Sequence, residues 1–263
     1  MLLFVDLFLL LSSSISVIIL LIMLLPSAYI LPGHAQVYQR YKNHNTTFAT
    51  NLMIMLKSAT YNAEMSINYT ASAHNGRSIF YAQGNIYDVE DEVMFYARSV
   101  TLLPNITTVC ETGFNAGHSA ITFLYANPKI KYIGFDRGGM KWSSSAVNYV
   151  KYLFGDRFEY HKGYSKDTLN PEVLNGQVCD LLSVDADHSN AYADFLLGRK
   201  VVRPNGYVLA DDYSSDCPPV IRDWNRATKE GIFKTLSCHK DAFRIFDDKG
   251  GYYKGWCLGQ YIN

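Results

Sequence analysis

Short apolar runs typical of buried strands alternate with longer segments of helical periodicity along the middle of this chain. The apolar runs predict strands at 107–111, 131–136, 158–162, 180–185 and 207–211. The intervening segments predict helices at 116–126, 143–154, 168–174, 190–201 and 220–230. Strands separated by helices of this length form a parallel sheet with right-handed crossovers. The pattern therefore predicts an α/β fold with a mostly parallel sheet and helices on both faces.

The segments before and after this α/β region predict further helices and strands. The segments 233–237, 243–247 and 256–261 have no helices between them and predict an antiparallel end to the same sheet. Apolar residues at helical spacing between 87 and 103 predict a helix that packs on the sheet. Short apolar groups within 51–80 are interpreted as helical and as covering the mouth of the site.

The N-terminal residues 7–31 contain no charge and are long enough to cross a bilayer. We interpret 1–31 as a signal-anchor, or alternatively a cleaved signal peptide, 32–86 as a stalk and cap region, and 87–263 as the α/β domain. The chain is thus expected to be a single-pass membrane protein of the secretory pathway. Which side the domain occupies stays open, because the charges around the span favour the cytosol whereas sequons at Asn45, Asn68 and Asn105 favour the lumen.

Charge and cysteine content narrow the choice of partners. Lys+Arg and Asp+Glu both number 24, so no global basic field suggests a nucleic-acid partner. Cys110 and Cys179 lie in strand-like runs and are interpreted as buried thiols. Among Cys217, Cys238 and Cys257, one disulfide is possible, with one thiol left over.

The segment 109–119 places an acid and two glycines where the first strand turns into a helix. Gly113 and Gly117 let the backbone approach a ligand closely, and Asp136 ends the next strand, where an acid can bind ribose hydroxyls. A dinucleotide loop normally has three glycines. The leading acid, Glu111, would repel a pyrophosphate but attract an ammonium or sulfonium group, which favours S-adenosylmethionine.

Acidic residues also end the fourth and fifth strands, at Asp185-Ala-Asp-His188 and Asp211-Asp212. Ligands bind beyond the carboxyl ends of the strands in such sheets, so these side chains are expected to meet at one edge. Three carboxylates that converge there repel one another unless a hard cation such as Mg²⁺ or Ca²⁺ neutralises them. The spacing therefore predicts a divalent cation site.

Together, 111–117, Asp136, 184–188 and 210–213 resemble class I S-adenosylmethionine-dependent methyltransferases, nearest to the cation-dependent O-methyltransferases of the catechol and caffeoyl-CoA type. The likeness covers roughly residues 88–261. It implies a Rossmann-like methyltransferase fold with a seven-stranded sheet, S-adenosylmethionine as methyl donor, and transfer to a hydroxyl oxygen of a small molecule or glycan. The segment 87–263 would then be the methyltransferase domain.

The resemblance also implies site residues. Asp185, Asp211 and Asp212 would hold the cation, although the second residue of the 211–212 pair is usually an amide. His188 and Asp185 would be catalytic, with His188 as base; alternatively His188 caps the next helix or orients Asp185. Ser165 would lie near the adenine, and Tyr164 or Trp142 could supply a stacking face. The residues expected to bind the methyl donor are Glu111, Gly113, Phe114, Gly117, Ser119, Asp136, Arg137, Gly163, Ser165 and Asp185.

Two other functions remain open. An NAD(P)-dependent oxidoreductase of Rossmann type could use the same glycine loop and Asp136, but no Tyr-x-x-x-Lys pair follows the fifth strand. A catalytically inactive, membrane-tethered binding protein of the same fold is the second alternative, against which the retained run of mutually repelling acids argues.

Overall fold

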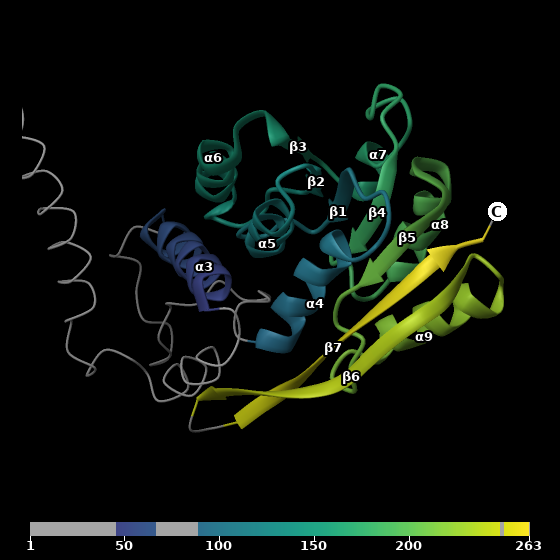
Figure 1. Cartoon of the computed structure of the whole chain (residues 1–263). Helices are drawn as coiled ribbons and strands as arrows, with labels where there is room; N and C mark the ends of the chain where they lie inside the picture. Colours follow the sequence, from purple (N-terminus) through teal and green to yellow (C-terminus); the bar gives the residue numbers. More distant parts are fainter. Residues whose placement is uncertain (1–45, 67–88, 248–249, 263) are drawn as a thin grey trace, which may run out of the picture. The chain divides into compact units, whose positions relative to one another are not determined.

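A seven-stranded sheet is the centre of the computed structural model, which describes residues 46–66, 89–247 and 250–262 (Figure 1). The strand order is β3-β2-β1-β4-β5-β7-β6. Strands β1 to β5 pair in parallel, whereas β7 runs antiparallel to both β5 and β6. The fold class predicted from the sequence is confirmed. The strand bounds are β1 Thr108–Thr112, β2 Lys131–Asp136, β3 Phe158–Lys162, β4 Cys179–Val184, β5 Val202–Ala210, β6 Phe233–Asp247 and β7 Gly250–Tyr261.

Helices cover both faces of the sheet because adjacent strand residues point to opposite sides. Ile133 of β2 belongs to a large core cluster that also contains Phe195 and Trp224, from the helices on one face. Its neighbour Tyr132 stacks on Phe123, from a helix on the other face. Figure 1 shows α5 and α8 on opposite sides of the strands. The helix bounds are α3 Thr46–Ser66, α4 Glu90–Thr101, α5 His118–Ala126, α6 Ser143–Phe154, α7 Ser165–Thr168, α8 Ala191–Val201 and α9 Pro218–Lys229, with a 3-10 turn η4 at Gly155–Arg157.

The helix predicted at 168–174 is misplaced. The structure has a short helix, α7, before it, and turns follow. Pro171 disfavours helical backbone at Asn170, and the Asn170 side chain instead accepts a hydrogen bond from the amide of Val173 at 2.9 Å. Local turn chemistry therefore overrides the apolar spacing.

The C-terminal segments form two long strands rather than three short ones. β6 and β7 pair along nearly their whole length, with register shifts at His239/Ala242 that accommodate a polar stretch. That stretch looks like a strand break in the sequence, but bulges keep the ladder continuous. The antiparallel end of the sheet is confirmed, and it carries β7 back across the end of β5.

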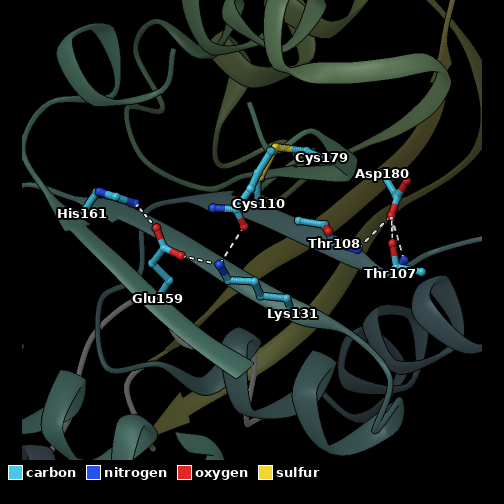
Figure 2. The surroundings of a disulfide bond; sticks show 9 residues. Thr107, Thr108, Cys110, Lys131, Glu159, His161, Cys179 and Asp180 are labelled. Carbon is cyan, nitrogen blue, oxygen red and sulfur yellow. Dashed lines mark hydrogen bonds and ion pairs between the residues drawn. A yellow bond between two sulfur atoms is a disulfide. The ribbon is translucent and has the colours of Figure 1, made fainter. Parts of the chain in front are cut away.

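Cysteine pairing corrects one sequence prediction. Cys110 and Cys179 are not free thiols; they form a disulfide between β1 and β4, with Cα atoms 5.7 Å apart (Figure 2). Because the two positions are 69 residues apart in sequence, only the adjacency of the strands brings them together. Cys238 pairs with Cys257 across β6 and β7, and Cys217 is a free thiol. This agrees with the prediction of one disulfide and one remaining thiol among these three cysteines.

Polar groups at the starts of the strands surround the first disulfide. The Asp180 carboxylate accepts hydrogen bonds from the Thr107 and Thr108 amides at 2.7 and 2.8 Å (Figure 2). Its other oxygen pairs with Arg203 at 2.6 Å. These contacts fix the amino-terminal edge of β1 and β4, opposite the edge where the predicted site lies.

The proposed membrane segment at 1–31 lies outside the described residues, as does most of the 32–86 region. Those domain boundaries therefore stay predictions. Within the ranges that the structure describes, no helix has the length and apolar character needed to cross a membrane. α3 covers the first part of the 51–80 helical prediction and contacts α5 through Thr60 Oγ1 and His118 Nε2, 2.8 Å apart.

Candidate active site

The loop from β1 to α5 is pressed against the segment that follows β4. Gly113 has φ of +93°, and a Cβ there would lie 1.9 Å from the Asp185 carbonyl oxygen. The Asp185 amide donates to the Thr112 carbonyl at 2.9 Å, which holds the two segments together. Gly117 begins α5 with φ of +82°, and a Cβ there would lie 2.8 Å from the Phe114 ring. Glycine is required at both positions, as the sequence pattern indicated.

Glu111 is fully buried beneath this loop. Its carboxylate accepts hydrogen bonds from Ser119 Oγ at 2.6 Å, from Ser183 Oγ at 3.0 Å, and from the Tyr132 hydroxyl. Burial raises the pKa of Glu111 to about 7, against the opposing effect of these hydrogen bonds. Glu111 therefore ties β1 to β2, β4 and α5, and its contact with a sulfonium or ammonium group stays a prediction.

Phe114 has a packing role in the structure. Its ring is 1% exposed and lies against Phe158 and Tyr160, with centroids 5.5 and 5.4 Å away. Because the ring is buried, only the backbone of Phe114 could make the predicted contact with the methyl donor.

Asp136, at the end of β2, is half-buried and points its carboxylate at two loops. It accepts a hydrogen bond from the Asn115 amide at 3.1 Å and another from the Gly138 amide at 2.6 Å. Asn115 in turn accepts a hydrogen bond from Trp142 Nε1 at 2.9 Å. Asp136 is thus held beside the glycine loop, and its contact with ribose hydroxyls stays a prediction.

The end of β3 adds exposed groups near this edge. Tyr164 is 57% exposed, and the exposed Arg137 guanidinium lies 5.8 Å from its ring centroid. Gly163 lies directly after β3, and a Cβ there would lie 2.6 Å from Thr168 Cγ2. Ser165 Oγ donates to Asp194 Oδ1 at 2.6 Å. The predicted adenine-side residues therefore come together, with Ser165 oriented by α8.

Acidic side chains converge at the ends of β4 and β5. His188 Nε2 lies 3.1 Å from Asp212 Oδ2 and 3.5 Å from Asp185 Oδ1. Ligand atoms of these three residues all lie within 4.8 Å of one another. The structure therefore brings together Asp185, His188 and Asp212, whereas the sequence predicted Asp185, Asp211 and Asp212 as the metal-binding set.

The sequence analysis missed two charged residues of this cluster, Lys254 of β7 and Glu92 of α4. Lys254 is 1% exposed, and its Nζ donates to Asp211 Oδ2 and to Asp212 Oδ1, both at 2.8 Å. Glu92 is fully buried, with Oε1 3.8 Å from the same Nζ. The sequence did offer a signal for each of them, because charged residues are rarely buried without a partner. Lys254 stands inside the aromatic run 252–257, and Glu92 lies one helical turn before Tyr96.

These contacts set the protonation of the cluster. Hydrogen bonds with Asp185 and Cys217, and the charges of Asp185 and Asp212, raise the pKa of His188 to about 11, against the effect of burial. Burial and the Asp211 charge raise the pKa of Asp185 well above its usual range. Burial acts to raise the pKa of Asp211, but the Lys254 charge and hydrogen bonds to the carboxylate outweigh it and lower that pKa to about 2. His188 is therefore an imidazolium at neutral pH in this arrangement. Its role as a base stays a prediction, against which the two adjacent carboxylates weigh.

The predicted cation site does not fit this donor arrangement. Asp211 and Asp212 each direct an oxygen at the Lys254 ammonium rather than at a shared open position. The remaining set contains a histidine that is paired with both of its carboxylates, whereas Mg²⁺ and Ca²⁺ prefer oxygen ligands. We therefore derive no step through a metal ion.

A cavity of about 340 Å³ lies elsewhere, between α4 and the β6–β7 pair. Phe95, His239 and Trp256 line it, and the last two rings stack with centroids 4.6 Å apart. None of the predicted strand-end residues lines this cavity, so it is separate from the candidate site.

The sheet order, with a glycine loop after β1 and Asp136 beside it at the end of β2, defines a Rossmann-like fold. Residues 110–213 match a protein family described as a methyltransferase domain. The match begins in β1 and ends just after Asp211 and Asp212, and it therefore contains most of the residues described above.

Solved structures share the fold at low sequence identity. The O-methyltransferase from Bacillus cereus in complex with SAH is 16% identical, with a TM-score of 0.56, and the alignment covers 79% of this chain and 90% of that one. The O-methyltransferase TomG from Streptomyces achromogenes, involved in tomaymycin synthesis and in complex with SAM, is 16% identical with a TM-score of 0.56, covering 80% and 90%. A Staphylococcus aureus protein provisionally assigned as a caffeoyl-CoA O-methyltransferase is 16% identical with a TM-score of 0.50, covering 65% and 82%.

No curated protein matches the chain significantly. The resemblance stated from the sequence is nevertheless confirmed by the domain match and by these folds. The oxidoreductase alternative gains no support from any of them.

Proposed function

We propose that the chain is an S-adenosylmethionine-dependent O-methyltransferase. The observation that carries the proposal is the glycine loop packed against the end of β4, with Asp136 fixed by two loop amides beside it, inside a matched methyltransferase domain. The solved structures of like fold include O-methyltransferases bound to SAM or SAH, which supports oxygen as the acceptor atom.

When bound, S-adenosylmethionine supplies an electrophilic methyl group, which the acceptor oxygen takes while the carbon–sulfur electron pair stays on sulfur. Asp136 would accept hydrogen bonds from the ribose hydroxyls, and Gly113 and Gly117 would let the backbone approach the donor. Asp185 and His188, at the end of β4, would face the acceptor, and the hydroxyl proton would pass to this hydrogen-bonded pair, in which burial and the Asp211 charge raise the pKa of the Asp185 carboxyl. The rate gain would come from holding the oxygen in line with the methyl group.

Calorimetry on the purified chain tests the proposal directly. We expect S-adenosylmethionine to bind and NAD to give no heat, and we expect Asp136→Ala to weaken binding roughly tenfold or more by removing a charge-assisted hydrogen bond. Asp156→Ala is the matched control, because this acid lies on the surface with a single 3.3 Å contact to Lys151. Tight NAD binding without S-adenosylmethionine binding would overturn the proposal. Methyl transfer to a panel of phenols and sugars then separates an enzyme from an inactive binding protein.

The divalent cation that the resemblance implies is not part of this proposal. Asp185, His188 and Asp212 could offer ligand atoms, but Asp211 is committed to Lys254. The acceptor is proposed only as a hydroxyl of a small molecule or glycan.

We also propose that the domain lies on the lumenal or extracellular side of a membrane. Two disulfides support this placement, since such bonds persist in oxidising compartments. The Asn105 sequon is exposed, and it precedes β1 at the amino-terminal edge of the sheet, so a glycan there would leave the candidate site free. An acceptor on a glycan or a secreted molecule fits that compartment.

A further inference from the structure

Lys254 occupies the position between two of the three aspartates that the sequence assigned to a metal ion. Its Nζ is 2.8 Å from Asp211 Oδ2 and 2.8 Å from Asp212 Oδ1, and its side chain is 2% exposed. A lysine that is fully removed from water is stable as an ammonium only when carboxylates surround it. Here it has two at contact distance. The Glu92 carboxyl lies 3.8 Å away, and burial and the Asp211 charge raise its pKa.

The backbone holds Lys254 firmly in this place. The next residue, Gly255, accepts a hydrogen bond from the Tyr213 amide at 2.8 Å, directly after Asp212. A Cβ on Gly255 would lie 2.1 Å from the Tyr213 carbonyl oxygen, so β7 can approach the end of β5 only with glycine here. The two aspartates and the lysine are therefore fixed by adjacent backbone segments rather than by a flexible surface contact.

The charge balance of the cluster follows from this arrangement. Three aspartates at two strand ends would repel one another if left alone. Lys254 contacts Asp211 and Asp212, and His188 contacts Asp212 and Asp185, so every aspartate has a basic side chain beside it. Two basic side chains therefore face three aspartates, and they reduce the repulsion from which the sequence predicted a divalent ion.

Resting on the function proposed above, we propose that the Lys254 ammonium is the resident cation of this site and that methyl transfer requires no divalent metal ion. Lys254 is a positioning residue: it holds Asp211 and Asp212 in place and keeps them from separating, and Asp212 in turn orients His188. A hydrated divalent ion and the ammonium cannot share the space between the same two carboxylate oxygens.

The experiment compares the full-length wild-type chain with Lys254→Ala and Lys254→Met. Both variants remove the charge, but only alanine leaves room for a hydrated ion, so methionine is the matched control. For the wild type we expect substoichiometric Mg, Ca, Mn and Zn after purification, and unchanged S-adenosylmethionine binding and turnover in EDTA. For Lys254→Ala we expect turnover to fall on the order of 100-fold in EDTA. Added Mg²⁺ or Mn²⁺ should recover it and raise the melting temperature, whereas Lys254→Met should gain neither.

The outcomes separate this inference from the proposed function. A stoichiometric divalent ion in the purified wild type, or loss of its turnover in EDTA with the fold intact, would overturn the inference and leave the methyltransferase proposal standing. Absence of S-adenosylmethionine binding by the folded wild type would remove the proposed function itself. If Lys254→Ala does not fold, the metal content and EDTA response of the wild type still decide the question.

Discussion

Gly113 shows how one residue couples the loop to the acidic cluster. Its φ is positive, and a Cβ at this position would lie 1.9 Å from the Asp185 carbonyl oxygen, which leaves no space for a side chain. We expect Gly113→Ala to lower the free energy of unfolding by roughly 3 kcal/mol or more and to abolish S-adenosylmethionine binding, measured by urea unfolding and calorimetry. Gly139→Ala is the control, because nothing lies within 4 Å of a Cβ there. Equal effects of the two substitutions would contradict the argument.

Because Glu111 is buried, it should make the free energy of unfolding depend on pH, in a direction that follows from its raised pKa. Its pKa rises from 4.5 to about 7 on folding, so the native state holds this proton more tightly than the unfolded chain. The resulting stabilisation is complete below pH 4.5 and is lost as the pH rises through 7. Between pH 5 and pH 8 we therefore expect wild type to lose about 2.5 kcal/mol of unfolding free energy relative to Glu111→Gln, at 1.36 kcal/mol per pKa unit.

The comparison with Glu111→Gln isolates this carboxyl from other buried groups. His118, for example, has its pKa lowered to about 4 by burial, which acts in the opposite sense in both proteins. Urea unfolding of the two proteins at both pH values gives the difference. If the difference in unfolding free energy between the two proteins does not change with pH, the pKa of Glu111 is not raised by folding.

Among the elements, the parallel half of the sheet could be predicted from sequence because short strand-like segments, most of them apolar, alternate with segments of helical periodicity. β2, α6 and β3 have the predicted bounds, and β1, β4, α8 and α9 differ by one or two residues at one or both ends. The position of the glycine loop beside Asp136 could then be predicted as well, because a parallel sheet places the ends of its strands at one edge. The β6–β7 pair was harder, since bulges let a polar stretch stay within a strand.

The residues that the sequence did not reveal come from elements that are distant along the chain. Lys254 meets Asp211 only because β7 folds back antiparallel to β5, and its register cannot be read from composition. Likewise, Cys110 and Cys179 look like ordinary core residues until β1 and β4 are known to be neighbours. The acids at the strand ends were foreseeable, whereas the cation that pairs with them was not.

At the scale of the whole molecule, the two disulfides and the Asn105 sequon make the compartment testable. A lumenal chain should retain one titratable thiol of its five cysteines, at Cys217, when denatured without reductant. It should also lose mass on endoglycosidase treatment, with one glycan removed by Asn105→Gln. Asn45→Gln and Asn68→Gln report separately on the other sequons.

The two readouts are independent, because disulfides need an oxidising compartment whereas glycosylation needs the lumenal transferase to reach an exposed asparagine. Of Asn105, Arg203 contacts the backbone carbonyl, at 3.5 Å, and not the side chain, so Asn105→Gln should leave S-adenosylmethionine binding unchanged. Five titratable thiols and no glycan on the chain expressed in its own type of cell would place the domain in the cytosol. That result would redirect the search for the acceptor to small phenols.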